Sequence, residues 1–376
     1  MHLSVPAPAL RIVQIVETLA VGGLETMALN LAIAHRKAGH LSAIFTLFEP
    51  GALEKEARAV GIPVVAFHKK KGARAGPILR MARQLRADGV HIVHTHNASV
   101  HPYGALAGKL AGAAVVNTRH GLALHSSPRQ EVNFQRVLPL TKAVVFVCEY
   151  GRQYYAAKGV APEGKSSVIL NGIPVEKFQA FRAAPGSRRP KLRFGTIGRC
   201  VRAKAHQDLL EAFGRIAQEL PEAELEIWGY GELQPELENR IAAMGMGERV
   251  HFRGPAENPA EVLRNMDVFV LSSISEGLPL VILEAMAAGL PIVSTRVGGV
   301  AEVAPEGTAA WFAEPGNPSN LAEALRRAAA SDLAAVGQAA YEIAEREFGV
   351  AKMQESYERL YRRVLSGGAV EGKAGA

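Results

Sequence analysis

Two glutamates in the second half of the chain, Glu276 and Glu284, lie on either side of a predicted helix start. Pro279 suits the first helical turn, and Gly289 suits the position after the last one. The amides of a helix N-terminus bind phosphate, and the separation of eight positions between the glutamates spans roughly 12 Å at helical rise. That is the length of a nucleotide-sugar diphosphate, with one carboxylate for sugar hydroxyls and the other for ribose hydroxyls. The alternative is two surface glutamates on an ordinary crossover helix.

Aspartate is scarce, and its scarcity limits the metal chemistry of the chain. The whole sequence contains only Asp88, Asp208, Asp267 and Asp332, and none lies two residues from another. The Asp-x-Asp pair that holds Mg²⁺ or Mn²⁺ in many transferases is therefore absent. Two cysteines exclude a disulfide framework and an all-cysteine zinc site, and they favour a reducing compartment. We expect neither a metal nor another bound cofactor.

Apolar strand-like runs alternate with amphipathic helical segments in both halves of the chain, and these elements must position the candidate residues. We expect strands at residues 11–17, 42–48, 63–67, 91–94, 114–118, 143–148, 192–197, 224–228, 250–253, 268–271 and 291–294. We expect helices at residues 23–38, 52–59, 78–86, 103–110, 130–138, 206–219, 236–243, 260–265, 281–288, 320–330, 332–347 and 351–365. Repeated β–α units build parallel sheets covered by helices on both faces, so the sequence predicts two doubly wound α/β domains.

The length of 376 residues suits two domains, and the 48% hydrophobic content can fill two cores. A segment rich in proline, glycine and arginine at residues 182–190 shows no periodicity and predicts the linker. We therefore expect an N-terminal domain at residues 1–181 and a second domain at residues 191–347. Residues 348–376 are expected to form a last helix with a frayed tail.

Positive charge is concentrated in the first half of the chain. The net charge is +7, but residues 1–182 carry +12 and the remainder carries −5. The densest stretch runs from Lys69 to Arg86 without an acid, and within it Ile78, Leu79, Ala82 and Leu85 predict the apolar face of a helix. This pattern favours contact with an anionic membrane surface, and the alternative is a solvated helix face. Nucleic acid is less favoured, because the stretch lacks stacking aromatic residues.

No apolar run reaches the roughly 18 residues of a membrane-spanning helix, and the first ten residues lack the pattern of a signal peptide. We expect a cytoplasmic protein, with peripheral contact at the inner face of the cytoplasmic membrane as a further expectation.

The segment from Asp267 to Pro291 resembles the signature of glycosyltransferase family 4. It contains Glu276, Pro279, Glu284, Gly289 and Pro291. Further matches in order and spacing lie at residues 22–25, 118–121, 171–173, 195–204, 228–231 with 237–238, and 250–254. Together they cover nearly the whole chain. The resemblance implies a retaining enzyme of the GT-B fold, in which two Rossmann-like domains face a cleft and the C-terminal helix crosses back to the first domain.

For the second domain, the resemblance implies a site for the nucleotide-sugar donor. Arg199 and Lys204 would supply cations for the leaving diphosphate, since that charge needs fixed cations and backbone donors where no metal is present. Glu276 and Glu284 would bind hydroxyls, beside a loop and helix start formed by Gly277, Leu278 and Pro279. The alternative for Arg199 and Lys204 is a solvated basic loop. One departure is Ala205, where the family usually has glycine, so the bend of this loop is open.

For the first domain, the resemblance implies contacts with the donor phosphate and the transferred sugar. Gly22 and Gly23 would approach the phosphate, and His120 would face the sugar; the alternatives are a bare strand-to-helix turn and a capping histidine. The absence of Gly-x-Gly-x-x-Gly after the first strand counts against an NAD(P) oxidoreductase. His94 and His96 could share a metal. We instead expect them to line the acceptor side together with Asn97 and the nearby His101.

The sequence thus predicts transfer of a sugar from a nucleotide-diphosphate sugar to a saccharide or lipid-linked acceptor, in cell-surface polysaccharide or glycoconjugate biosynthesis. A UDP-sugar is the default donor and GDP-mannose the next. Three alternatives stay open: a GT-B-fold epimerase or phosphorylase, a non-catalytic nucleotide-sugar-binding protein, and a basic lipid- or nucleic-acid-binding protein.

Overall fold

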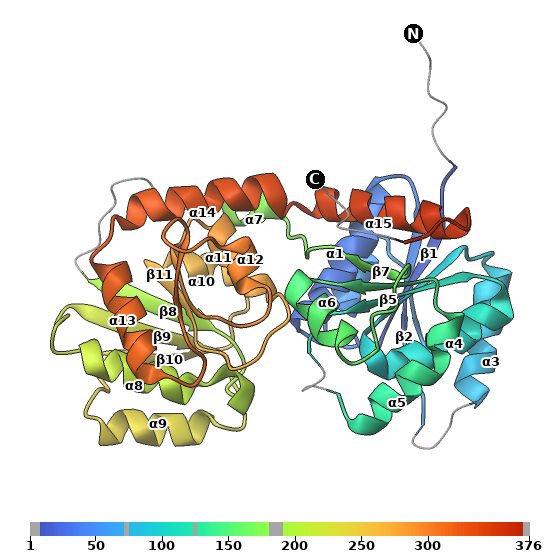
Figure 1. The fold of residues 1–376 in the computed structure, drawn as a ribbon. Helices are drawn as coiled ribbons and strands as arrows, with labels where there is room; N and C mark the ends of the chain where they lie inside the picture. Colours follow the sequence, from blue (N-terminus) through green and yellow to red (C-terminus); the bar gives the residue numbers. More distant parts are fainter. Residues whose placement is uncertain (1–7, 71–74, 123–125, 180–190, 371–376) are drawn as a thin grey trace, which may run out of the picture. The chain divides into compact units, whose positions relative to one another are not determined.

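The structure, a computed structural model, describes residues 8–70, 75–122, 126–179 and 191–370 and divides them into two compact units (Figure 1). One unit contains the described residues up to Gly172 and those from Val350 onward, and the other runs from Ile173 to Gly349. The boundary therefore comes earlier than expected from the sequence, and the expected linker at 182–190 lies outside the described residues. So do residues 371–376 of the tail and both Lys71 and Arg74 of the basic stretch.

The first unit contains a seven-stranded parallel sheet in the order β3-β2-β1-β4-β5-β6-β7. Its strands are β1 (Arg11–Val16), β2 (Leu41–Thr46), β3 (Val64–Ala66), β4 (Ile92–His96), β5 (Ala114–Arg119), β6 (Ala143–Phe146) and β7 (Ser166–Val168). Its helices include α1 (Gly23–Lys37), α2 (Glu54–Ala59), α3 (Ala75–Ala87), α4 (Asn97–Ala111), α5 (Pro128–Val137), α6 (Glu149–Ala156) and α15 (Val350–Leu365). Strands such as β6 are apolar and buried throughout, as expected where helices cover both faces of a parallel sheet.

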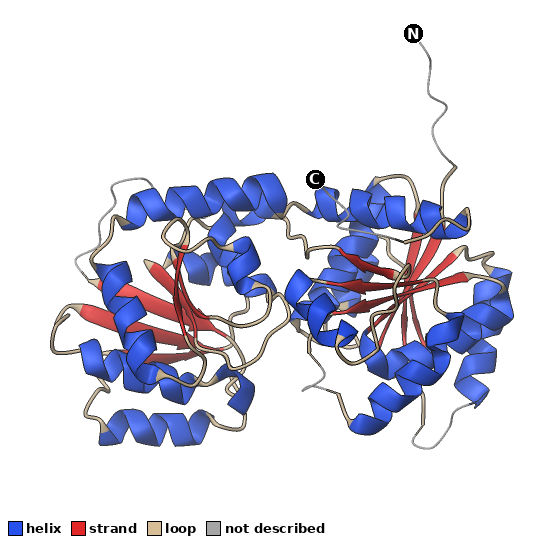
Figure 2. Cartoon of the chain, viewed as in Figure 1, coloured by secondary structure: helices blue, strands red, loops and turns tan. Residues whose placement is uncertain are grey.

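The second unit contains a six-stranded parallel sheet in the order β10-β9-β8-β11-β12-β13. Its strands are β8 (Leu192–Ile197), β9 (Ala223–Trp228), β10 (Val250–Gly254), β11 (Val268–Leu271), β12 (Ile292–Thr295) and β13 (Ala310–Ala313). Its helices include α7 (Val175–Gln179), α8 (His206–Ile216), α9 (Gln234–Ala243), α10 (Pro259–Arg264), α11 (Leu280–Ala287), α12 (Val300–Val303), α13 (Pro318–Ala329) and α14 (Leu333–Glu347). Figure 2 shows the strands of each unit surrounded by helices.

Both sheets have the doubly wound strand order, in which the chain starts in the middle, builds one edge and then crosses over to build the other. The predicted fold class is thereby confirmed. The crossover lies between β1 and β4 in the first unit and between β8 and β11 in the second. Ligands of such sheets bind beyond the carboxyl ends of the strands at this switch point, so the loops after these four strands are where a site is expected.

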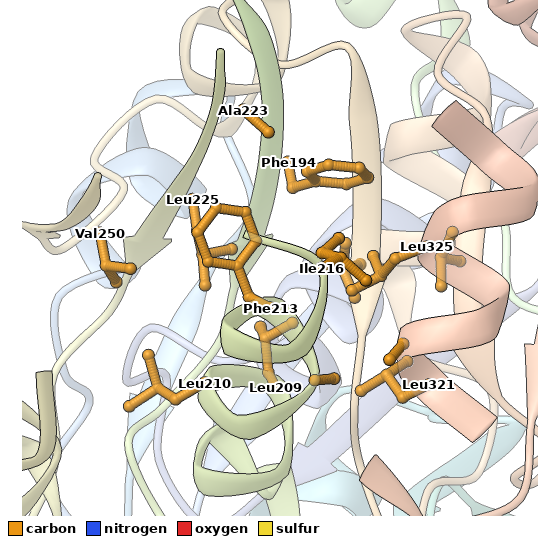
Figure 3. Packing of buried hydrophobic residues seen from close by; sticks show 14 of the residues in the cluster. Phe194, Leu209, Leu210, Phe213, Ile216, Ala223, Leu225, Val250, Leu321 and Leu325 are labelled. Atoms are coloured by element: carbon orange, nitrogen blue, oxygen red, sulfur yellow. The ribbon is translucent and has the colours of Figure 1, made fainter. Parts of the chain in front are cut away.

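The core of the second unit holds the strands and helices that carry those loops (Figure 3). Phe194 of β8 packs edge-to-face against Phe213 of α8, and Leu325 of α13 belongs to the same buried cluster. Because α8 follows directly on the loop after β8, this packing determines where that loop begins and ends. Burying such large side chains contributes roughly 1.5–3 kcal/mol each.

Two local expectations differ from the structure in the first unit. Helix α4 starts at Asn97 and not at residue 103, and Pro102 lies inside it. In α3 the structure buries Met81, Ala82 and Leu85 but leaves Leu79 about half exposed, so the apolar face is rotated from the predicted one.

Helix α15 closes the first unit from the far end of the sequence. It packs against α1, and its side chains Tyr357 and Tyr361 are buried. Among the described residues, no helix has both the length and the apolar character needed to cross a membrane.

Candidate active site

Two predicted site residues of the second unit, Lys204 and Glu276, lie in direct contact. The Lys204 Nζ atom donates to Glu276 Oε1 at 2.6 Å, and Ser273 Oγ donates to the same oxygen at 2.6 Å. Both ends of the ion pair are largely buried, with 20% of the lysine side chain and 12% of the glutamate side chain exposed. An ion pair of this kind in a partly desolvated position is electrostatically stronger than one at the surface.

The loops that carry this pair follow β8 and β11, the two strands at the switch point. Ser272 Oγ donates to the carbonyl of Lys204 at 2.8 Å, and the amide of Ile274 donates to the carbonyl of Ala203 at 2.9 Å. Thr295, at the end of β12, donates from Oγ1 to the carbonyl of Ser273 at 2.6 Å. Three strand ends are thus joined by hydrogen bonds around the carboxylate and the ammonium group.

Ala205 occupies the position where a glycine was expected from the resemblance, and its backbone takes the conformation that glycine would allow. Its φ is +46° and its ψ is 43°, which is the left-handed region. The residue ends the short 3-10 helix Arg202–Lys204 and caps α8. A left-handed alanine costs roughly 1–2 kcal/mol. The loop therefore bends sharply after Lys204, and the substitution adds backbone strain to that bend.

Arg199, the other predicted cation, lies on the same loop and is exposed. Its guanidinium has no hydrogen bond or ion pair with any residue in the described ranges, whereas Lys204 is paired. The loop is held by the segment after β9, because Gly198 donates to Trp228 and Cys200 donates to Tyr230, at 2.9 and 2.8 Å. The structure thus brings Lys204 to Glu276 but records no contact between Arg199 and either residue.

The segment after β9 requires a glycine at position 229, because two backbones lie close together there. Gly229 has a φ of +145°, and a Cβ atom there would lie 1.9 Å from the carbonyl oxygen of Gly198. Any other residue at this position would push the Arg199 loop away. The glycine is therefore explained by close approach between two backbones of the protein itself.

The helix that follows Glu276 differs slightly from the prediction. Helix α11 begins at Leu280, so Pro279 is its N-cap and does not lie in the first turn; Gly289 follows the helix with a φ of +74°, as predicted. The first amides of α11 lack intrahelical partners by the geometry of a helix. Gly277 and Leu278 lie in the turn between Glu276 and this helix start, where they were expected.

Glu284 lies within α11 and carries a perturbed carboxyl group. Burial raises the pKa of Glu284 to about 7, and the charge of Lys177 opposes this shift in part. The protonated form of Glu284 therefore persists to higher pH than in an exposed glutamate, and in that form the carboxyl can donate to a hydroxyl group as well as accept from one.

In the first unit, His120 follows β5 and is held by two hydrogen bonds. Its backbone amide donates to Asn97 Oδ1 at 2.9 Å, and its Nε2 atom lies 2.9 Å from His96 Nδ1. Burial, and to a lesser extent the charge of Arg119, lowers the pKa of His120 to about 3. Asn97 has a φ of +65°, a left-handed conformation that asparagine tolerates. His120 is therefore a neutral imidazole with a well-defined position.

The structure corrects the expectation that His94 and His96 line an acceptor surface with Asn97. His94 binds Thr118 and Tyr361 through its two ring nitrogens, and both nitrogens of His96 are also occupied. Burial lowers the pKa of both histidines well below the usual value. His101 is buried on α4, between Thr95 and Thr141. No group of three His, Cys, Asp or Glu side chains in the described parts of the chain is arranged to hold a metal.

Gly22 and Gly23 stand at the start of α1, after the first strand, as predicted. Gly22 is the N-cap residue with an extended φ of −171°, a conformation open to any residue. A Cβ atom at Gly22 would lie 2.5 Å from a carboxylate oxygen of Glu25. Glycine here provides space beside the first turn of α1 but is not required by the backbone conformation.

Two known protein families match this chain, one in its first half and one in its second. Residues 21–177 match the family described as Glycosyltransferase Family 4, and residues 191–331 match Glycosyl transferases group 1. The chain is a family 4-type glycosyltransferase of the GT-B fold. The resemblance to glycosyltransferase family 4 that the sequence motifs indicated is thereby confirmed.

Individual relatives agree with this assignment. The chain is similar to the Escherichia coli UDP-Gal:alpha-D-GlcNAc-diphosphoundecaprenol alpha-1,3-galactosyltransferase, with 28% identity over 264 residues. The aligned region covers 66% of this chain and 68% of the relative. The chain is also 33% identical over 166 residues to N-acetyl-alpha-D-glucosaminyl L-malate synthase of Bacillus anthracis, and this alignment covers 44% of this chain and 43% of that protein. Among solved structures, Anabaena Alr3699/HepE in complex with UDP superposes with a TM-score of 0.83 and 19% identity, covering 94% and 100% of the two chains.

Sequence reasoning missed several residues that build the site of this glycosyltransferase. Ser273 and Thr295 hold the Glu276 loop, and Gly298 packs against it with a φ of +52°: a Cβ atom there would lie 2.1 Å from the carbonyl oxygen of Gly277. The amide of Gly299 donates to that same oxygen at 2.7 Å. The glycine pair after β12 was a visible signal for close backbone approach, whereas nothing local marked Ser273 or Thr295.

Proposed function

We propose that this glycosyltransferase is a retaining, metal-independent enzyme that transfers a sugar from a nucleotide-diphosphate sugar to a hydroxyl of a saccharide or lipid-linked acceptor. The observation that carries the proposal is the Lys204–Glu276 pair at the switch point of the second sheet, beside the N-terminus of α11. A UDP-sugar is the preferred donor class, since the E. coli relative is named for UDP-Gal and the Anabaena structure contains UDP. GDP-mannose is the next choice.

The donor site follows from the charges of the second unit. As the bond between the anomeric carbon and the diphosphate breaks, negative charge develops on the leaving phosphate. Lys204 and Arg199 would stabilise that charge, together with the first amides of α11. A diphosphate competes with Glu276 for the Lys204 ammonium group, and the released carboxylate then accepts hydrogen bonds from sugar hydroxyls. Glu284 would bind ribose hydroxyls.

The transfer itself would occur on one face of the sugar. The acceptor hydroxyl attacks the anomeric carbon from the side on which the diphosphate leaves, and its proton passes to the leaving phosphate. The products are a nucleoside diphosphate and a glycoside with the anomeric configuration of the donor. Neutral His120 and the glycines Gly22 and Gly23 of the first unit would contact the transferred sugar and the donor phosphate, respectively.

The test is product analysis with UDP-glucose, UDP-galactose, UDP-N-acetylglucosamine and GDP-mannose, each with undecaprenyl-diphosphate-linked sugar as acceptor and an excess of EDTA. We expect one donor to release nucleoside diphosphate, with the α configuration retained in the NMR spectrum of the product. An epimerised donor without diphosphate release would identify an epimerase. A nucleotide-sugar-induced rise in melting temperature with no turnover of any donor would identify a binding protein, and turnover that stops in EDTA would overturn metal independence.

We further propose that the first unit contacts an anionic membrane, where a lipid-linked acceptor would be found. Helix α4 packs against both α3 and α5, and the three helices lie side by side in Figure 1. They carry four of the exposed large apolar side chains of the described chain, Leu79, Leu106, Leu110 and Val132. The same three helices also carry exposed cations, namely Arg83, Arg86, Lys109, Arg129 and Arg136. Exposed apolar residues among cations are typical of surfaces that bind anionic lipid.

Vesicle co-sedimentation tests this contact with the full-length protein. We expect binding to phosphatidylglycerol vesicles that weakens with added salt, and little binding to phosphatidylcholine vesicles. The double variant Arg83→Glu/Arg129→Glu should lose most of the binding, whereas Lys55→Glu, an exposed charge reversal on α2, should keep it. If both variants lose vesicle binding equally, binding depends only on net charge, and the assignment of this surface is overturned.

A further inference from the structure

A chain of hydrogen bonds runs beneath His120 through three neighbouring strands of the first sheet. Gln14 of β1 lies with its Oε1 atom 2.8 Å from His96 Nε2, and His96 Nδ1 lies 2.9 Å from His120 Nε2. Strand β4 pairs with both β1 and β5. Gln14 lies within β1, His96 is the last residue of β4, and His120 directly follows β5. Gln14 and His96 are buried, at 0% and 1% exposure.

The chemistry of these groups determines where the protons lie. The amide oxygen of Gln14, which faces His96 Nε2, can only accept a hydrogen bond, so this orientation of the amide assigns the proton of His96 to Nε2. A neutral His96 then has a lone pair on Nδ1, and His120 must donate to it from Nε2. A neutral His120 with its proton on Nε2 has its remaining lone pair on Nδ1. That Nδ1 atom has no hydrogen-bond partner among the residues that the structure describes.

Both histidines are neutral, which the assignment requires. Burial is the main reason that the pKa of His96 lies well below its usual value, and neighbouring His94 and His120 add to the effect. The pKa of His120 is lowered to about 3 by burial and by the charge of Arg119. Near neutral pH, neither ring gains the second proton that would reverse the direction of these hydrogen bonds.

Side chains of the C-terminal helix α15 pack against the hydrogen-bonded series formed by Gln14, His96 and His120. Tyr361 of α15 lies with its hydroxyl 2.7 Å from His94 Nδ1, and Tyr357 lies 2.9 Å from the hydroxyl of Thr118. His94 and Thr118 are themselves joined at 2.7 Å. The ring of His94 lies against the ring of His96, with centroids 4.3 Å apart. The position of His96 is therefore fixed on one side by Gln14 and on another by side chains anchored to α15.

We propose that Gln14 and His96 are positioning residues that hold His120 in the tautomer protonated on Nε2, so that its Nδ1 lone pair accepts a hydrogen bond from a hydroxyl of the transferred sugar. The proposal rests on the proposed function of His120. An uncharged acceptor suits a reaction in which the sugar becomes positively charged, because an imidazolium at this position would repel that charge. A histidine in the other tautomer would present a donor to the same hydroxyl.

The test uses the full-length protein labelled with ¹⁵N-histidine, with the His120 signals assigned by comparison with His120→Asn. In the wild type we expect His120 to be protonated on Nε2 and unprotonated on Nδ1 across pH 6–8. The variant His96→Leu removes the acceptor, so His120 should populate both tautomers, and kcat should fall roughly 10-fold or more while KM for the acceptor stays within about twofold. The variant His96→Asn offers a carbonyl oxygen near the former Nδ1 position and should restore most of kcat.

The outcomes separate this proposal from the proposed function. A wild-type His120 with its proton on Nδ1 overturns the positioning role, whatever the activity. A shift of tautomer in His96→Leu without loss of kcat also overturns it. An unchanged tautomer pattern in a protein that transfers no sugar would instead refute the proposed function. If His96→Leu unfolds, as judged by circular dichroism, the wild-type spectrum and the spectrum of Gln14→Leu decide the question.

Discussion

The two units use different physical means to build their parts of the candidate site. In the second unit Lys204 and Glu276 are oppositely charged, lie on loops and are joined by a short hydrogen bond. In the first unit the corresponding group is neutral His120, which rests on buried polar side chains from β1, β4 and the C-terminal helix. Fixed charge suits a leaving diphosphate, whereas a neutral acceptor suits a sugar that becomes cationic. Under the proposed function, the two units would meet opposite electrostatic requirements.

The strongest way to test this contrast is to remove the charges of the second unit. Lys204→Ala and Glu276→Gln should each lower kcat/KM at least about 100-fold, because preorganised electrostatic groups contribute on this scale. Arg202→Ala, a change of an exposed cation in the same loop, should stay within about twofold. Initial rates of nucleoside diphosphate release measure the effect. Equal losses in Arg202→Ala and Lys204→Ala would show that only overall loop charge matters.

The second prediction concerns pH and Glu284. Its pKa is raised from 4.5 to about 7, so the folded state holds a proton that the unfolded state has lost between these pH values. The free energy of unfolding should therefore fall as pH rises from about 4.5 to 7 and level off above it. Glu284→Gln removes this penalty and should stabilise the protein at pH 8 by on the order of 1–2 kcal/mol, with little effect near pH 4. Urea unfolding at both pH values measures the difference, and an equal gain at both would contradict the pKa.

The third prediction addresses the support of the first unit by α15. Tyr361→Phe removes the hydroxyl that binds His94 and leaves one buried ring nitrogen without a partner. The free energy of unfolding should decrease by about 1–3 kcal/mol. Tyr230→Phe, a change at an exposed tyrosine of the second unit, is the control and should change it little. Urea denaturation compares the two variants, and indistinguishable midpoints would show that the buried hydrogen bond contributes nothing.

The smallest effect is expected at the bend after Lys204. Ala205→Gly should stabilise the protein by up to about 1 kcal/mol, because the relief of left-handed strain exceeds the added entropy of the unfolded chain. Ala203→Gly in the adjoining 3-10 helix lacks that strain and should destabilise. Melting temperatures of the two variants provide the measurement. A lower melting temperature for Ala205→Gly would mean that the alanine side chain contributes packing that outweighs the strain.

Much of the second unit could be predicted from local patterns. The helix near Glu284 was recognisable from its proline and from Gly289, and Lys204 lies five residues from Arg199 on one loop. What the patterns did not show was that Lys204 and Glu276 pair with each other, since their loops meet only through the order of the strands. The boundary before Ile173 was also missed, because α7 packs against α11 of the second unit although it precedes the proline- and glycine-rich segment.

The amino-acid sequence alone determined the two series of strands and helices, the doubly wound class and the family, because these depend on hydrophobic periodicity and on short motifs. Tertiary structure decided the surroundings of His120. Gln14, His96 and Tyr361 lie far apart in the chain and meet only when β1, β4 and α15 are in place. A hydrogen bond depends on distances and directions between side chains in space, and no local spacing in a sequence specifies those for residues that the fold brings together from opposite ends of the chain.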